Sequence, residues 1–289
     1  MTMSLRRWLP ALVLALTAFV VGASAQEPKK PQEAAKPQEP TLTVDQMKAF
    51  LLKAEIVGSR GTPKGITSPY RLTLKDGTLT HQAGFQAIDE RATRRDFADG
   101  SVELNFVDSY RYDIAAYELA TLLGLGDMMP VTVERTWQGK TGALSWWLPV
   151  KMDEQTRIRK NIHVPDVDAW NHQMYKKWIF AELVYDTDPN MTNLLISEDW
   201  HLWMIDFSRA FRLHTNLRQP QNVEKALCSR DLLDRLRALK HEDVEKAVGR
   251  NLTRYEIDGL MARRDKIVAI IDKRIKAQGE KAVLFDKRP

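Results

Sequence analysis

The 289-residue chain carries 43 lysines and arginines against 38 aspartates and glutamates, and it has a single cysteine, Cys228. This near balance of charge gives no indication of nucleic-acid binding. One cysteine excludes an intrachain disulfide and any cysteine-based metal site, and the six histidines lack the spacing of a zinc enzyme. The length is sufficient for one large domain or two coupled domains.

The first 25 residues have the three parts of a secretory signal peptide. Arg6 and Arg7 are basic, residues 8–21 form an apolar segment, and Ala23-Ser24-Ala25 provides a small-x-small cleavage site. The apolar segment is shorter than the roughly 18–20 residues that span a bilayer, which favours cleavage over a retained anchor. We therefore expect a periplasmic or secreted chain that starts near Gln26 and has no transmembrane segment.

Residues 26–41 consist almost entirely of Pro, Gln, Glu, Lys and Ala, which predicts a disordered linker. A first lobe is then expected at 42–150. Thr43 and Gln46 have the spacing of a capping box, which predicts a helix that continues to about Val57.

The rest of this first lobe is predicted to be rich in strands. Asp76-Gly77 lies between two strand-like segments and predicts a tight hairpin. The charged residues 89–100 are expected to form a solvated loop. Apolar residues at helical spacing predict a helix over 109–124, and two further strands are expected on either side of Gln138-Gly139.

The second lobe, 151–289, is predicted to be mainly helical. Asp166 is placed to cap one helix, and further helical segments are expected at 224–249 and 253–278. Gly279 follows the last of these, as a glycine commonly does after the end of a helix.

The segment YDTDPNMTNLLISEDWHLWMIDFSRAF, residues 185–211, contains the residues that phosphoryl transfer would need. Asp188 and Asn193 are separated by four residues, and Asp206 directly follows an apolar strand. The intervening residues predict a hairpin that brings Asn193 and Asp206 together. An Asp-x4-Asn pair is also common in ordinary turns, and Asp206 would then be a solvated strand end. The hairpin and the order of the two lobes favour the catalytic interpretation.

Four stretches carry a resemblance to a known family: YDIAAYELATLLGLGDMMPVTVER, TGALSWWLPV, DTDPNMTNLLIS and LWMIDFSRAF. They resemble the atypical kinases related to phosphatidylinositol 3/4-kinases and secretory-pathway kinases, and MARRDKIVAIIDKRIKAQGEKAVLF is similar to the last helix of their bacterial relatives. The resemblance covers about residues 43–285. It implies an α+β, bilobal kinase-like fold, with one helix inserted in a small strand-rich lobe and a mainly helical second lobe.

The resemblance also implies roles for individual residues. Asp188 would be the catalytic aspartate, and Asn193 and Asp206 would bind Mg or Mn. ATP or another nucleotide would lie between the lobes, near Asp113 of the small-lobe helix. The acceptor would be a hydroxyl-bearing molecule that the sequence does not identify.

Three parts of the implied nucleotide site depart from the family or have a simpler explanation. Trp146 and Trp147 would begin a hinge against the adenine, but they equally fit the core and the surface of one strand. Gly65 lies in a glycine-rich stretch that would cradle phosphates or form an ordinary flexible loop. Gln86 stands where the family has a phosphate-binding lysine, and it brings no charge.

Two main hypotheses follow, and a third is a structural envelope protein with incidental acidic residues. The first is an exported ATP-dependent phosphotransferase acting on a hydroxyl of a protein, glycan or lipid. The second is a degenerate kinase fold of the cell envelope that binds a nucleotide, a metal or a partner without transfer. Retention of Asp188, Asn193 and Asp206 favours the enzyme, whereas Gln86 and the predicted compartment favour the binding protein.

The export hypothesis predicts that the mature chain begins near Gln26. N-terminal sequencing of the protein from fractionated cells measures this directly. An intact Met1 in the cytosolic fraction would contradict it.

Overall fold

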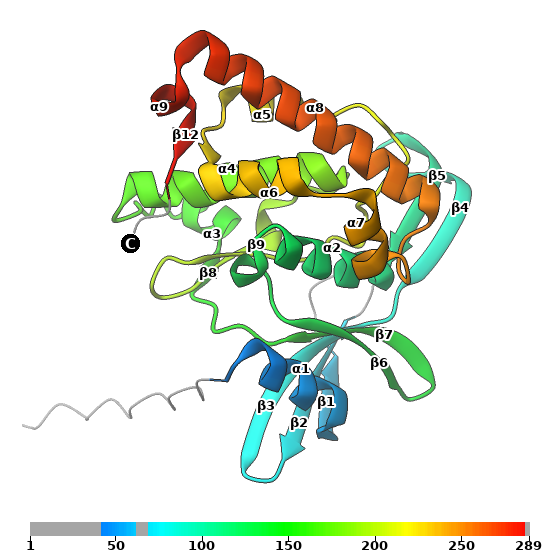
Figure 1. Ribbon diagram of the computed structural model, residues 1–289. Helices are drawn as coiled ribbons and strands as arrows, with labels where there is room; N and C mark the ends of the chain where they lie inside the picture. Colours follow the sequence, from blue (N-terminus) through cyan, green and yellow to red (C-terminus); the bar gives the residue numbers. More distant parts are fainter. Residues whose placement is uncertain (1–41, 62–68, 287–289) are drawn as a thin grey trace, which may run out of the picture. The chain divides into compact units, whose positions relative to one another are not determined.

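The structure is a computed structural model that describes residues 42–61 and 69–286 (Figure 1). The predicted signal peptide, the predicted linker and Gly65 lie outside the described residues. Residues from Leu42 onward form one compact unit, in which a strand-rich N-terminal lobe precedes a helical C-terminal lobe. In the described ranges, no helix has the length and apolar character needed to cross a membrane.

The first helix is shorter than the sequence predicts. Helix α1 (Val44–Lys53) begins at the expected capping box, in which Thr43 Oγ1 and the Gln46 side chain bond each other's backbone N–H groups. It ends before Val57, because strand β1 (Glu55–Gly61) takes over and pairs antiparallel with β2 (Tyr70–Asp76). The prediction of a helix to Val57 was therefore wrong.

The N-terminal sheet has the strand order β1-β2-β3-β7-β6. Strand β3 (Leu79–Gln86) follows β2 through the predicted turn, where Gly77 has φ 57°. Strands β6 (Thr132–Trp137) and β7 (Lys140–Trp146) form the second predicted hairpin. Gln138 and Gly139 both have positive φ there, as a two-residue turn between twisted strands requires. Both hairpin predictions are confirmed.

The charged residues 89–100 do not form the predicted loop. Strands β4 (Asp89–Asp96) and β5 (Val102–Ser109) pair along their whole length as a separate hairpin. Most of their side chains are exposed, so the sequence lacks the apolar alternation that reveals a half-buried strand. Phe97 N donates to Ser101 O at 2.9 Å and closes the turn.

Helix α2 (Tyr110–Leu122) connects the two lobes. It packs on β6 and β7 of the small lobe and on helix α7 (His241–Val248) of the large lobe. Ser109 caps it, and its buried side chains include Tyr112, whose hydroxyl donates to Glu256 Oε1. The helix predicted at 109–124 is thus confirmed.

The C-terminal lobe begins with a short three-stranded sheet of order β10-β9-β8. In chain order, its first elements are β8 (Met152–Asp153), α3 (Glu154–Arg159), α4 (Val167–Val184), the 3₁₀ helix η2 (Met191–Asn193), β9 (Leu194–Ile196) and β10 (Leu202–Met204). Asp166 caps α4 as predicted, because its Oδ1 accepts from Ala169 N at 2.9 Å.

The segment predicted to be helical at 224–249 is interrupted. The remaining elements are α5 (Gln221–Lys225), β11 (Cys228–Ser229), α6 (Arg230–Ala238), α7, α8 (Arg254–Gln278), α9 (Glu280–Val283) and β12 (Leu284–Phe285). The first break arises where Cys228 and Ser229 pair in parallel with Leu284 and Phe285, a long-range contact that no local pattern indicates, and residues 239–240 form a second break between α6 and α7. Helix α8 matches its prediction and ends before Gly279, which has φ 84°.

Helix α8 runs across α4, α5, α6 and α7 and carries a fully buried arginine, Arg263 (Figure 1). Its guanidinium donates to Leu183 O at 2.7 Å, to Arg212 O at 2.9 Å and to His214 O. Burial lowers the pKa of Arg263 to about 10. One side chain of α8 therefore satisfies backbone carbonyls at the end of α4 and in residues 212–214.

We expect Arg263→Met to lower the free energy of unfolding by about 2–4 kcal/mol, because buried carbonyls would lose their donor. Urea denaturation measures the change. The exposed Lys273→Met on the same helix is the matched control and should shift stability by less than about 0.5 kcal/mol. Equal urea midpoints for the two variants would contradict the role given to Arg263.

Candidate functional site

The loop after α4 presents Asp188 to solvent. Tyr185 ends the helix in the left-handed region, with φ 52°, and turns the chain away from the helix axis. The buried Asp186 then accepts a hydrogen bond from Asp188 N at 3.0 Å, and Asp188 O accepts from Asn190 N at 2.7 Å. The loop backbone is held from within, while the Asp188 side chain remains exposed.

Asp186 is a supporting residue that the sequence analysis did not single out. Burial raises its pKa to about 6, although the hydrogen bond from Asp188 and the charge of Lys177 act in the opposite direction. Lys177 is itself desolvated, and burial lowers its pKa. A loop aspartate and a helix lysine carry no sequence signal that would reveal this arrangement.

The hairpin β9–β10 brings Asn193 close to Asp206 along the backbone. Met204 pairs with Leu194, and Ile205 N donates to Asn193 O at 3.0 Å, so Asn193 lies opposite the neighbour of Asp206. Asp206 has φ 61°, a left-handed conformation that aspartate tolerates better than most residues. Strain of this kind is concentrated at functional sites. Ser208 Oγ donates to Asp206 Oδ1 at 3.1 Å.

Asp113 reaches the same region from α2. Its Oδ1 accepts from Phe207 N at 2.6 Å, next to Asp206 in the chain. Burial, and then the negative charge of Asp206, raise the pKa of Asp113 well above its usual value. Asp206 is open to solvent on one side, yet desolvation of its carboxylate, followed by the charges of Asp108 and Asp188, also raises its pKa.

The residue that the sequence analysis missed is Asp108, at the end of β5. Burial raises its pKa, and its Oδ1 has no hydrogen-bond partner among the described residues. It was missed because residues 89–100 were predicted as loop, which concealed the hairpin that delivers Asp108 to the site. We call the four carboxylates the acidic cluster, which consists of Asp108, Asp113, Asp188 and Asp206.

The acidic cluster, together with the Asn193 amide, has the chemistry of a hard-cation site. Carboxylate and amide oxygens are the ligands that Mg²⁺ and Mn²⁺ prefer. A nearby cation also stabilises the ionised form of carboxylates whose pKa values are raised. Within residues 42–61 and 69–286, no three acidic, histidine or cysteine side chains already converge closely enough to hold an ion. Metal binding by Asn193 and Asp206 stays a prediction.

Gln86 lies at the end of β3, paired with Ala143 of β7. Strand alternation places it on the same sheet face as Gly84, whose cross-strand partner on β2 is Arg71. No hydrogen bond joins Gln86 to Asp113 in the described part of the chain, and Asp113 Oδ1 accepts instead from Phe207 N. The proposed lysine position therefore carries an uncharged amide.

The two tryptophans have different surroundings. Trp146 is buried in the small lobe, stacked on His81 with ring centroids 3.7 Å apart and edge-on to Phe50. Trp147 lies under the Arg71 guanidinium, 4.2 Å from the ring centroid, and Arg71 also donates to Gln82 Oε1. Trp146 therefore belongs to the core and Trp147 to the surface of one strand end, which is the simpler of the two explanations given above. Contact of either indole with a nucleotide stays a prediction.

We expect Asp113→Asn to raise the melting temperature of the metal-free protein at pH 7 by about 3–6 °C. The raised pKa means that the ionised carboxylate destabilises the fold at neutral pH. Asparagine keeps the oxygen that accepts from Phe207 N. Below about pH 3.8, where the unfolded aspartate is also protonated, the gain should vanish.

The exposed Asp243→Asn serves as the control and should leave the melting temperature nearly unchanged at both pH values. A loss of stability in Asp113→Asn at pH 7 would contradict the electrostatic account of the acidic cluster.

No sequence-family model and no curated protein sequence matches the chain. Several solved structures resemble it in fold. A Fam20 protein of hydra, solved with a sugar, has a TM-score of 0.60 at 15% identity, over 85% of this chain and 93% of that one.

Two further structures share the fold. The Golgi casein kinase has a TM-score of 0.56 at 13% identity, over 83% of this chain and 77% of that one. The proinflammatory kinase CtkA of Helicobacter pylori has a TM-score of 0.52 at 10% identity, over 79% of this chain and 98% of that one. The predicted α+β kinase-like fold, with a strand-rich N-terminal lobe and a helical C-terminal lobe, is thereby confirmed.

Proposed function

We propose that this chain is an exported, metal-dependent phosphotransferase that transfers the terminal phosphoryl group of a nucleoside triphosphate to a hydroxyl group. The acidic cluster is the observation that carries the proposal. Desolvation, and then the negative charges of neighbouring carboxylates, raise the pKa values of Asp113 and Asp206 beside the Asn193 hairpin, an arrangement that costs stability. The kinase-like fold supports the same reaction class.

Asp188 would act on the acceptor. Its carboxylate is exposed on a loop whose backbone is fixed by Asp186, so it is free to accept a hydrogen bond from an incoming hydroxyl. The hydroxyl oxygen bonds to the terminal phosphorus, the bond from phosphorus to the bridging oxygen breaks, and the hydroxyl proton passes to Asp188. A nucleoside diphosphate leaves.

Asn193 and Asp206 would hold a divalent cation, with Asp108 close enough to share its charge. A bound Mg²⁺ or Mn²⁺ supplies positive charge that offsets the negative charge of the phosphates. The hydrogen bond from Phe207 N to Asp113 keeps the segment that carries Asp206 against α2. The chain's own contribution to the reaction is therefore orientation and charge placement.

A second candidate function is nucleotide or partner binding without transfer. Gln86 favours it, because an amide donates a weaker hydrogen bond to phosphate than a lysine ammonium does. Arg71 also favours it. This arginine lies on the same face of the sheet as Gln86, but its guanidinium is already occupied by the Trp147 ring and Gln82 Oε1, so it does not replace the missing lysine. The phosphotransferase and the nucleotide-binding form of the second candidate both predict nucleotide binding, and phosphoryl transfer separates them.

The test measures thermal shifts with ATP and with GTP, each with and without Mg²⁺ or Mn²⁺, together with metal-dependent ATP turnover. We expect Asp206→Ala to lose the metal-dependent part of the nucleotide stabilisation. Asp188→Ala should keep that stabilisation and lose turnover by about 100-fold or more, because its role is confined to the acceptor.

Asp243→Ala, exposed and far in sequence from the acidic cluster, is the control for both variants. Turnover in Asp188→Ala equal to that of the unsubstituted protein would remove the catalytic assignment. Nucleotide stabilisation without turnover in the unsubstituted protein would establish the binding function instead.

A further inference from the structure

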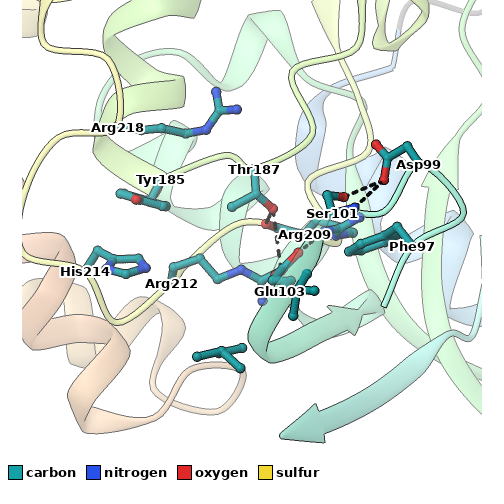
Figure 2. Close-up of a pocket in the computed structure, with 12 residues that line it drawn as sticks. Phe97, Asp99, Ser101, Glu103, Tyr185, Thr187, Arg209, Arg212, His214 and Arg218 are labelled. Atoms are coloured by element: carbon teal, nitrogen blue, oxygen red, sulfur yellow. Dashed lines mark hydrogen bonds and ion pairs between the residues drawn. The ribbon is translucent and has the colours of Figure 1, made fainter. Parts of the chain in front are cut away.

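A cavity of about 440 Å³ opens beside the catalytic loop, between the turn of the β4–β5 hairpin and the segment that follows Asp206 (Figure 2). Phe97 and Glu103 line it from the hairpin, and Thr187 lines it from the loop. Thr187 directly precedes Asp188 and donates to Arg209 O at 2.7 Å. The cavity therefore reaches the loop that carries the proposed catalytic carboxylate, and its size suits a small polar group.

Positive charge predominates in this cavity. Arg209, Arg212 and Arg218 all line it, against the carboxylates of Asp99 and Glu103. Asp99 is occupied by the backbone N and the Oγ of Ser101, at 2.9 and 2.7 Å. Arg218 is exposed and makes no hydrogen bond or ion pair with any described residue. Figure 2 shows Arg218 and the hairpin residues on opposite sides of Thr187.

The guanidinium groups of the half-buried Arg209 and the buried Arg212 are only partly hydrogen-bonded. Arg212 is 7% exposed, and its Nη2 lies 2.5 Å from Glu103 Oε1, while Arg209 Nη2 pairs with the other oxygen of Glu103. Arg209 Nε, Arg212 Nε and Arg212 Nη1 are buried with no partner in the described part of the chain. Buried guanidinium nitrogens of this kind are costly unless an acceptor reaches them.

We propose that this cavity binds a phosphate monoester carried by the acceptor, and so holds the acceptor hydroxyl near Asp188. The inference rests on the proposed phosphotransferase function. A phosphate monoester offers three terminal oxygens and nearly two negative charges, which suit a cavity lined by three arginines better than the two oxygens of a carboxylate do. This phosphate is unchanged in the reaction, since the new bond forms at the separate hydroxyl.

Glu103 is the acidic residue of the cavity that pairs with both Arg209 and Arg212. It bridges Arg209 and Arg212 from the hairpin and neutralises part of their charge. A glutamine there would keep the shape and remove the competing carboxylate. The cavity thus provides variants with opposite expected effects: Glu103→Gln should tighten phosphate binding, and Arg218→Gln should weaken it.

The experiment titrates inorganic phosphate into the full chain without nucleotide, at constant ionic strength, by calorimetry and thermal shift. We expect phosphate to bind and acetate to bind much more weakly. Arg218→Gln should weaken phosphate binding roughly three- to tenfold, and Glu103→Gln should strengthen it. The exposed Arg250→Gln, outside the cavity, should leave it unchanged.

Three results would overturn the inference: acetate binding as tightly as phosphate, Arg218→Gln binding phosphate normally, or Asp206→Ala abolishing phosphate binding. The first would indicate a carboxylate-bearing acceptor such as an acidic peptide, and the last would place phosphate at the metal site. Phosphate binding without any ATP turnover would refute the proposed phosphotransferase function, while the cavity would remain established as an anion-binding site. Turnover with glycerol 3-phosphate no better than with glycerol would refute the acceptor role alone.

Discussion

The buried guanidinium of Arg263 is the constraint on which the geometry of the candidate site depends. It donates to carbonyls at Leu183, Arg212 and His214, and so ties the end of α4 to the segment that follows Asp206. The loop that carries Asp188 begins two residues after Leu183, and Arg212 lines the proposed anion cavity. A single charge in the interior therefore fixes the spacing between the loop that carries Asp188 and the cavity wall that contains Arg212.

Negative and positive side chains gather in two separate groups near the segments that Arg263 holds together. Acidic side chains gather where α2, β5 and the β9–β10 hairpin meet, and arginines gather along the cavity beside the Asp188 loop. Asp108 lies at the border, because Arg209 and Arg212 partly offset its desolvation. Each group alone is unfavourable for folding, since like charges repel and buried guanidinium nitrogens lack acceptors. A cation on one side and an anion on the other would relieve both.

Many elements of the fold and of the candidate site were predictable because they depend on residues that are close together in the sequence. Asp76-Gly77 and Gln138-Gly139 require particular turns, Thr43 caps a helix, and Asn193 and Asp206 flank a short hairpin, so sequence alone located them. What was missed depends on distant partners. Strand β4 has few buried side chains, Cys228 pairs with Leu284, and the arginines converge only after folding. Long-range contacts of this kind leave no periodic pattern in the chain.

The β4–β5 hairpin pairs only with itself in the described part of the chain, outside the five-stranded sheet. Its turn reaches the cavity through Phe97 and Glu103, while its base is joined to the large lobe by the hydrogen bond from Ser109 N to Ser208 O at 2.9 Å. Most of its side chains contribute nothing to the core. Mutations in the turn of the hairpin can therefore change which molecules the cavity admits without altering the core, whereas Asp108 near its base belongs to the acidic cluster.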